Sequence, residues 1–220
     1  MIWTLPNLLT MLRIAAAPTV AAMVALGGPV LLFPAFLLFA VAALTDFLDG
    51  WIARRFDQQS ALGQMLDPIA DKVMVILVLF GLAAQESQRS WLFLLPAFAI
   101  LLREIMVSGL REFLGDVKLP VTRLAKWKTT AQLSALGVLL LFSREHAAGT
   151  SSLEDGASQV VLDLLIWQRI VTADAFLNTL TLGATLGLAL LWLAAALTLI
   201  TGWDYFQKAM PYIRAKQETP

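Results

Sequence analysis

The sequence has no cysteine, one histidine and few charged residues, and each of these shortages excludes a class of chemistry. Without cysteine, the protein has neither a disulfide bond nor a thiolate nucleophile. The single histidine, His146, lies in the polar stretch REHAAGTSS, where a solvated loop position is a simpler interpretation than a metal ligand. The formal net charge is zero, so the composition gives no argument for binding nucleic acid.

Apolar residues dominate what remains. They make up 59% of the 220 residues, well above the share in a soluble domain. Apolar runs long enough to cross a bilayer recur along the chain. We therefore predict an all-α polytopic membrane protein, a single domain over residues 1–220 with six transmembrane helices and an N-terminal interfacial segment.

The expected spans follow from these runs and from the polar stretches between them. A first span ends at residue 26 and is followed by a tight turn at residues 27–29. The later spans are expected at residues 30–56, 60–84 and 91–114, then one that ends near residue 142, and a last one at residues 180–201. We interpret residues 144–178 as a non-cytoplasmic insertion outside the catalytic machinery.

Four aspartates stand in one stretch of the chain, DFLDGWIARRFDQQSALGQMLDPIAD. Asp46 and Asp49 are three residues apart and Asp67 and Asp71 four, so each pair lies on one face of a helix. Ionisable groups at membrane depth are costly and generally functional, and four carboxylates so close together require cations. Hard oxygen ligands suit Mg²⁺, Mn²⁺ or Ca²⁺ rather than zinc, and four of them can hold two ions that clamp a phosphate.

Small residues and one arginine accompany the aspartates. Gly50, Ala53 and Gly63 would remove side-chain bulk beside the carboxylates, so that a phosphorylated ligand can approach the backbone. Arg54 can meet a phosphate with two parallel hydrogen bonds.

Together these eight positions form the pattern D-x2-D-G-x2-A-R-x8-G-x3-D-x3-D, which resembles the signature of the CDP-alcohol phosphatidyltransferases at every fixed place. The resemblance implies an integral membrane enzyme in which an alcohol displaces CMP from a CDP-linked lipid. It also implies that two divalent ions, Mg²⁺ or Mn²⁺, bind Asp46, Asp49, Asp67 and Asp71 and hold the diphosphate. Asp71 is then expected to act as the general base on the incoming hydroxyl.

The N-terminal stretch MIWTLPNLLTMLR carries a polar stripe at Asn7, Thr10 and Arg13. By pattern alone this stripe is equally well the solvated face of an amphipathic helix. PNLLTMLR, however, resembles the phosphatidylglycerophosphate synthase branch of the family, which would turn the stripe toward the cytidine nucleotide. Thr45 could hydrogen-bond either the nucleotide or its own helix. The expected nucleotide and diphosphate site therefore comprises Asn7, Thr10, Arg13, Thr45, Gly50, Ala53, Arg54 and Gly63.

Basic residues cluster later in the chain. Arg103 and Arg111 are eight residues apart and so lie on one side of a helix, with Glu104 and Glu112 directly after them. They can be interpreted either as partners in salt bridges between helices or as a phosphate site. The segments REI, SGLRE and KxKTTAQ resemble the same branch of the family, whose acceptor is sn-glycerol 3-phosphate. On that resemblance the acceptor phosphate is expected at Arg103, Arg111, Lys126 and Lys128.

Three alternatives remain open on the sequence. The acidic motif does not choose the acceptor, so inositol phosphate, serine or phosphatidylglycerol could replace glycerol 3-phosphate. Outside this class, the acidic cluster could serve a divalent-cation transporter, although Gly50, Ala53, Arg54 and Gly63 would then have no role. A prenyltransferase with Asp-rich diphosphate motifs is a third option, disfavoured by the unbroken eight-position pattern.

The distribution of Lys and Arg predicts the orientation in the membrane. If the aspartate end faces the cytoplasm, thirteen of the 16 basic residues lie on that side and only Arg89, Arg144 and Arg169 on the other. Both termini and the active site are therefore expected to face the cytoplasm. The resemblance implies a bacterial inner membrane, CDP-diacylglycerol and sn-glycerol 3-phosphate as partners within membrane lipid, and a family that is often homodimeric.

Overall fold

The computed structural model describes residues 4–26, 28–55, 60–85, 90–115, 123–142 and 173–218. Within these ranges the chain forms α-helices and no strand, which confirms the all-α prediction for this part of the chain. The helices are α1 Leu5–Leu26, α2 Gly28–Arg55, α3 Ala61–Ala84, α4 Trp91–Leu114, α5 Arg123–Leu141 and α8 Ala173–Glu218.

Local signals fix several helix ends where the sequence predicts them. Ser60 caps α3, because its hydroxyl accepts a hydrogen bond from the amide of Gly63. Gly115 ends α4 with a positive φ of 58°, a conformation that glycine adopts without steric cost. The predicted turn at residues 27–29 is too long, because α2 already begins at Gly28. Pro29 falls in the first turn of that helix, where its missing N–H has no partner to lose.

The last helix is longer than predicted. α8 has 46 residues and continues well past Thr201, where the predicted span ends. The aromatic residues around Trp203 therefore do not mark a helix end. Trp203 stacks on Phe206 with ring centroids 5.9 Å apart, and Lys208 pairs with Asp204 one turn before it. Of the predicted insertion, residues 144–172 lie outside the described residues together with His146, and residues 173–178 belong to α8.

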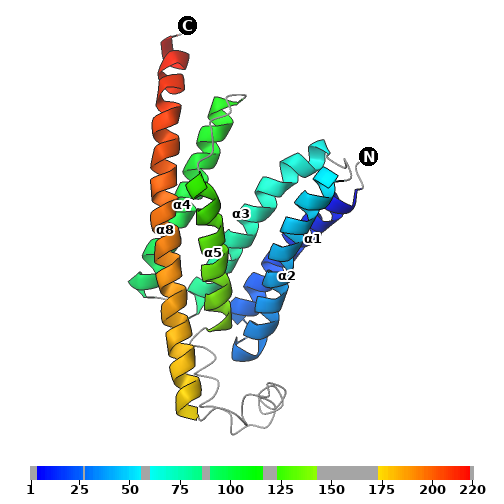
Figure 1. Ribbon diagram of the computed structural model, residues 1–220, viewed down its shortest axis with the longest axis vertical. Coiled ribbons are helices and arrows are strands. Elements are labelled where there is room, and N and C mark those ends of the chain that lie inside the picture. The colour runs from blue at the N-terminus through cyan, green and yellow to red at the C-terminus, as the bar shows by residue number, and fades with distance from the viewer. Residues whose placement is uncertain are drawn as a thin grey trace.

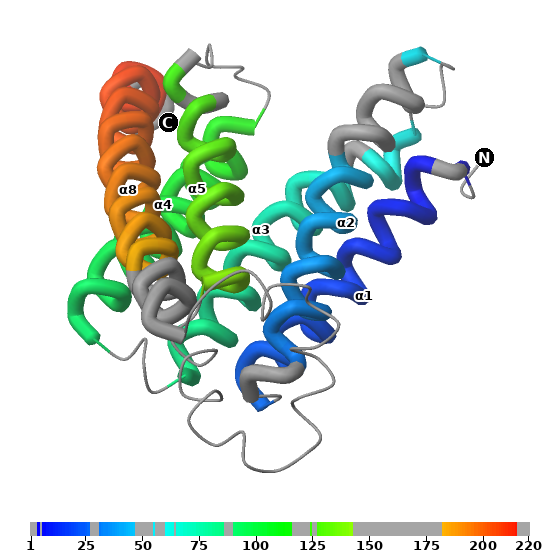
Figure 2. The backbone as a smooth tube through the Cα atoms, turned by 60° about the horizontal axis from the view of Figure 1, so that its bottom comes forward, coloured from blue at the N-terminus to red at the C-terminus, as the bar shows by residue number. Residues whose placement is uncertain are grey.

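The helices form two groups of three. α1 packs against α2 and α3, and α8 packs against α4 and α5, while the groups meet where α2 and α3 face α5 and α3 faces α4. Figure 2 shows the first group on one side of the molecule and the second on the other. Successive helices alternate in direction, so both termini lie toward the upper end in Figure 1. α1, α3 and α5 start at this end, and α2 and α4 finish there. The candidate site residues on these helices therefore all lie in the half of the helix nearer this end.

Three helices are long and apolar enough to cross a membrane, among the residues that could be searched: Pro6–Leu26, Trp91–Leu114 and Leu182–Arg214. This supports a membrane protein, whereas six spans remain a prediction. α2 has only a shorter apolar stretch, Leu31–Asp46. α3 and α5 are not apolar enough to count among these helices. Asp67, Asp71 and Lys72 interrupt the apolar run of α3, and Lys126 and Lys128 interrupt that of α5.

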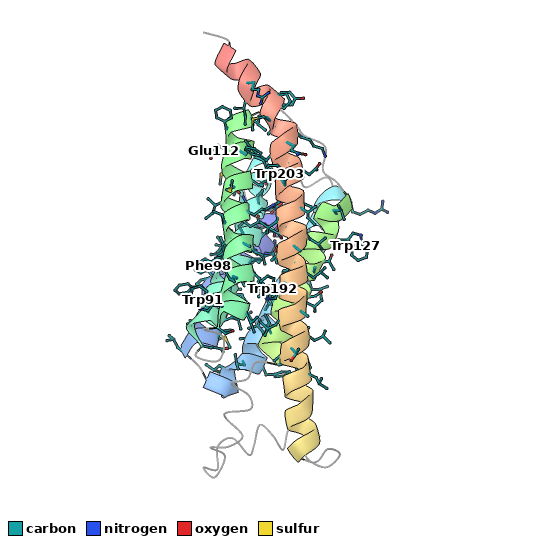
Figure 3. All side chains as sticks on the ribbon, turned by 90° about the vertical axis from the view of Figure 1, so that its left-hand side faces the viewer. Trp91, Phe98, Glu112, Trp127, Trp192 and Trp203 are labelled. Carbon is teal, nitrogen blue, oxygen red and sulfur yellow. The ribbon has the colours of Figure 1, made fainter. Side chains whose placement is uncertain are left out.

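Exposed tryptophans bracket an apolar surface. Trp91 lies near the lower end of α4 and Trp203 in the upper part of α8 (Figure 3), and both side chains are mostly exposed. Tryptophan prefers the headgroup level of a bilayer. Between these levels α4 exposes large apolar side chains such as Phe98 and Leu102, which water would not favour but lipid would.

The first group depends on close contact between α1 and α3. A Cβ atom at Gly81 would lie 2.9 Å from the carbonyl oxygen of Ala21 and 3.2 Å from its Cα, so the glycine lets two backbones approach. Gly109, in α4, is a matched contrast, since a Cβ there would meet nothing within 4 Å.

We expect Gly81→Ala to lower the stability of the protein by about 1–3 kcal/mol, because the backbones must move apart. Gly109→Ala should leave stability unchanged or raise it by up to about 1 kcal/mol through better helix propensity. Thermal unfolding of both variants in one detergent tests this. Equal midpoints for the two variants would show that the α1–α3 contact does not limit stability.

Candidate functional site

The N-terminal polar stripe lies against the start of α3. The Thr10 hydroxyl is 3.0 Å from an Asp67 carboxylate oxygen and equally far from the carbonyl oxygen of Pro6. Its single proton serves one acceptor at a time, and the charged one is the stronger partner. Asn7 accepts a hydrogen bond from Ser60 at 2.8 Å. The stripe is therefore buried against α3 rather than solvated, since Asn7, Thr10 and Arg13 are all almost fully enclosed.

Gly63 makes this contact possible. A Cβ atom at this position would lie 2.7 Å from Oδ1 of Asn7 and 3.2 Å from Oγ of Ser60. Any side chain would thus push apart the first turn of α3 and the stripe of α1. The close approach of Asn7 is enough to explain why a glycine stands at position 63. A ligand could also lie nearby, but this explanation does not need one.

Arg13 joins the two halves of the aspartate motif. One nitrogen of its guanidinium, Nη1, contacts Oδ1 of Asp46 on α2 and lies 3.1 Å from Oδ1 of Asp71 on α3. The arginine side chain is only 2% exposed, whereas those of Asp46 and Asp71 are 44% and 57% exposed. A buried cation therefore supports two carboxylates whose outer sides remain accessible.

The carboxylates suit a hard cation by chemistry and by position. Asp46 and Asp71 already share one positive charge, and Asp67 is near enough to Asp71 for their charges to repel. Carboxylate oxygens are the donors that Mg²⁺ and Mn²⁺ prefer. No three acidic or histidine side chains form a metal-binding group among those that could be searched, and the side chain of Asp49 lies outside that set. Both the binding of a metal and the number of ions therefore remain predictions.

Several predicted site residues cannot be placed beyond their helix. Asp49, Gly50, Ala53 and Arg54 belong to α2, and Lys126 belongs to α5, but their side chains lie outside the described residues. Thr45 can be placed, and its hydroxyl donates to the carbonyl oxygen of Ala42 at 2.8 Å. Of the two interpretations of Thr45, bonding to its own helix is the one observed.

An apolar groove runs from this site along α1 and α2. It has a volume of about 380 Å³ and is lined by side chains such as Leu12, Ala16 and Val41. Arg13 and Thr45 contribute to the same lining. The groove thus joins an almost entirely apolar surface to the charged end of the bundle, an arrangement that suits a ligand with a polar head and an acyl chain.

The second group of helices holds a buried ionic cluster. Lys128 of α5 contacts Oε1 of Glu104 of α4, and Nη1 of Arg103 lies 3.4 Å from the same oxygen. Another nitrogen of Arg103 lies 3.4 Å from the Thr201 hydroxyl on α8. The structure therefore brings together two of the four predicted basic residues, Arg103 and Lys128, through Glu104. This glutamate forms a salt bridge between α4 and α5, as one of the two interpretations of the basic residues expected.

Arg111 lies at the edge of this cluster. Its guanidinium sits 5.4 Å from the ring centroid of Tyr205 on α8, as in a cation–π contact. It is still close enough to Arg103 and Lys128 for their like charges to interact. Together Arg103, Arg111 and Lys128 carry three positive charges against the single negative charge of Glu104.

A hydrogen bond joins the helix of Asp67 and Asp71 to the helix of Arg103 and Glu104. Lys72, next to Asp71 on α3, donates to the hydroxyl of Ser108 on α4. Ser108 in turn lies 2.6 Å from the carbonyl oxygen of Glu104. Sequence reasoning missed this link, as well as Ser60, Thr201 and Tyr205. Ser60 could have been found from the preference for serine at a helix N-cap. The other residues could not, because their contacts join helices that are far apart in the sequence.

The comparison with known proteins supplies the class of chemistry. A sequence profile described as CDP-alcohol phosphatidyltransferase matches residues 3–200. The chain belongs to this family. The prediction that it is a CDP-alcohol phosphatidyltransferase is thereby confirmed, and the cation-transporter and prenyltransferase alternatives are removed.

Relatives within the family are similar over most of the chain. A CDP-diacylglycerol–glycerol-3-phosphate 3-phosphatidyltransferase of Cereibacter sphaeroides is 46% identical over 217 residues, which cover 96% of this chain and 98% of the relative. A protein of the same name from Rickettsia bellii is 39% identical and covers 94% and 96% of the two chains. One from Escherichia coli K12 is 39% identical over 142 residues, 63% of this chain and 77% of the relative.

Removal of the Arg13 guanidinium tests how this phosphatidyltransferase holds its acidic end together. We expect Arg13→Gln to lower stability by about 1–2 kcal/mol without divalent ions, because neighbouring carboxylates then repel one another without a cation. Added Mg²⁺ or Mn²⁺ should raise the unfolding temperature of this variant more than that of the wild type.

Arg55→Gln, which removes an exposed arginine from the same end of α2, is the matched control and should behave like the wild type. Thermal unfolding over a range of Mg²⁺ concentrations provides the measurement. If Arg13→Gln and the wild type responded identically to Mg²⁺, Arg13 and a metal ion would not share the same carboxylates.

Proposed function

We propose that the protein transfers the phosphatidyl group of CDP-diacylglycerol to sn-glycerol 3-phosphate, giving phosphatidylglycerol phosphate and CMP. The observation that carries this proposal is the charge of the basic cluster at the same end as the aspartates. Arg103, Arg111 and Lys128 less Glu104 leave two positive charges, in a cluster whose Arg103 and Lys128 are largely buried and whose Arg111 is exposed at the edge. A phosphate monoester carries close to two negative charges at neutral pH, so it would balance this cluster.

The acidic end would bind the donor. When bound at Asp46, Asp49, Asp67 and Asp71, two divalent ions, Mg²⁺ or Mn²⁺, would supply positive charge to the diphosphate. The proposed nucleotide and diphosphate side of the site lies on α1, α2 and α3 and comprises Asn7, Thr10, Arg13, Thr45, Gly50, Ala53, Arg54 and Gly63. The groove along α1 and α2 gives one acyl chain an apolar path that starts beside Arg13.

The reaction itself would need one proton acceptor. Asp71 is more than half exposed and is oriented by Arg13, so an incoming hydroxyl can reach it. As Asp71 takes the proton, the hydroxyl oxygen bonds to the lipid-bearing phosphorus, and the bond from that phosphorus to the CMP oxygen breaks. The Lys72–Ser108 link keeps the helix of Asp71 against the helix of Arg103, which would align the two substrates.

The acceptor is the part of the proposal that depends on the basic cluster. The names of the Cereibacter sphaeroides and Rickettsia bellii relatives support glycerol 3-phosphate. A neutral acceptor such as serine would leave the positive charge that Glu104 does not offset without a partner. The excess of basic residues at this end also supports an orientation with both termini and the active site in the cytoplasm.

We expect Asp71→Asn to reduce CMP release by about 100-fold or more, because the amide cannot accept the proton. Asp204→Asn, which removes a carboxylate of α8 that pairs with Lys208 away from the aspartate motif, is the matched control and should keep wild-type activity. CMP release in detergent with CDP-diacylglycerol, Mg²⁺ and separate acceptors tests this. Turnover with serine or inositol phosphate in place of glycerol 3-phosphate would contradict the proposed acceptor.

The groove provides a separate prediction about the donor. Val41 lines it and Leu44 does not, although both side chains are more than half exposed on α2. We expect Val41→Trp to raise KM for long-chain CDP-diacylglycerol about tenfold by displacing roughly two methylene groups at about 0.8 kcal/mol each. Leu44→Trp should not, and neither variant should affect a short-chain donor. Equal effects of the two tryptophans would show that the chain lies elsewhere.

A further inference from the structure

Glu104 is a carboxylate in the site where the proposed function needs an anion to bind. Its side chain is 15% exposed, and those of Arg103 and Lys128 are 12% and 8% exposed. Lys and Arg bind carboxylates and phosphates through the same charge-assisted hydrogen bonds. The glutamate therefore engages the groups that a phosphorylated acceptor would use.

We propose that Glu104 holds Lys128 and Arg103 until the acceptor binds, and that the acceptor's phosphate then displaces its carboxylate from these cations. Glu104 would thus be a positioning residue that competes with the acceptor and sets its affinity. This inference rests on the proposed function, because it assigns the acceptor phosphate to the basic cluster.

The contacts of Glu104 match those of a temporary partner. Both cations approach the same oxygen, Oε1, so one carboxylate oxygen serves two positive groups. The contacts of Arg103 to Glu104 and Thr201 are both 3.4 Å, at the long end of hydrogen-bond distances. Its Nε is buried and has no hydrogen-bond partner among the described residues. A phosphate has three terminal oxygens and could satisfy donors that one carboxylate oxygen does not.

Helix α8 holds Arg103 in reach of such a ligand. A Cβ atom at Gly202 would lie 2.8 Å from Cγ of Arg103, so the arginine stem lies directly on the α8 backbone. The Nε of Arg103, unpartnered in the described part of the chain, is a group that a polar ligand in the cluster would be expected to complete.

The proposed role has a kinetic signature because the product of the reaction keeps the acceptor's phosphate. Without the charge of Glu104, the cluster would carry three positive charges and would hold both acceptor and product more tightly. We expect Glu104→Gln to lower KM for glycerol 3-phosphate about five- to tenfold and to lower kcat as product release slows. A purely structural role would leave KM unchanged or raise it.

The test compares Glu104→Gln with Glu112→Gln, a variant of an exposed glutamate nearer the upper end of the same helix (Figure 3). Besides kinetics, thermal unfolding is measured with glycerol 3-phosphate or inorganic phosphate as the probe. Without the probe, Glu104→Gln should unfold at a lower temperature than the wild type. Adding the probe should raise the unfolding temperature of this variant more than that of the wild type. Glu112→Gln should match the wild type in both.

The inference would be overturned if KM stayed the same or rose in Glu104→Gln and the probe raised its unfolding temperature less than that of the wild type. If this variant does not fold, Glu104→Asp replaces it, since the charge remains but the shorter side chain weakens the contact with Lys128. A fall in KM of about twofold would then support competition, and a rise would contradict it. Wild-type CMP release with glycerol 3-phosphate separately tests the proposed function, so the two failures are distinguishable.

Discussion

The contact of Arg13 with Asp46 and Asp71 is the interaction on which the acidic end of the bundle depends. It joins three helices, because the guanidinium comes from α1 and the carboxylates from α2 and α3. Carboxylates gathered near a membrane surface would repel one another and resist burial without a cation. The buried arginine supplies that cation and leaves both carboxylates about half exposed.

The same principle recurs with opposite sign in the second group of helices. There, Glu104 stands among cations of α4 and α5, as Arg13 of α1 stands among carboxylates of α2 and α3. In both places one residue offsets part of a local excess of charge and leaves the remainder for a ligand. The acidic excess suits metal ions and a diphosphate, and the basic excess suits a phosphate monoester. The Lys72–Ser108 contact keeps these two charged regions adjacent.

Much of this arrangement could be predicted from the sequence because it depends on local patterns. The bounds of α4 follow from an apolar run that ends at Gly115, and the motif from Asp46 to Asp71 identifies the chemistry through its spacing. The continuation of α8 could not be predicted from the aromatic residues near Trp203, because aromatic residues indicate a preferred environment and not where a helix ends.

Contacts between side chains on different helices also could not be predicted from the sequence. Arg111 and Lys128 look equivalent in a list of basic residues, yet Arg111 contacts Tyr205 at the edge of the cluster and Lys128 contacts the partly buried Glu104. Similarly, the stripe of Asn7, Thr10 and Arg13 is compatible with a solvated helix face until α3 is placed against it. In each case the partner lies on another helix, so spacing along one helix carries no information about it.

The central claim is that a phosphate-binding cluster stands beside the acidic site and selects the acceptor. The most direct test is the ratio of kcat/KM for sn-glycerol 3-phosphate to that for glycerol, measured as CMP release from CDP-diacylglycerol. The two acceptors share the attacking hydroxyl and differ in the phosphate. We predict a preference for the phosphorylated acceptor of about 1,000-fold or more, as expected when charged groups in the site would otherwise be left unpaired. Comparable use of glycerol would contradict it.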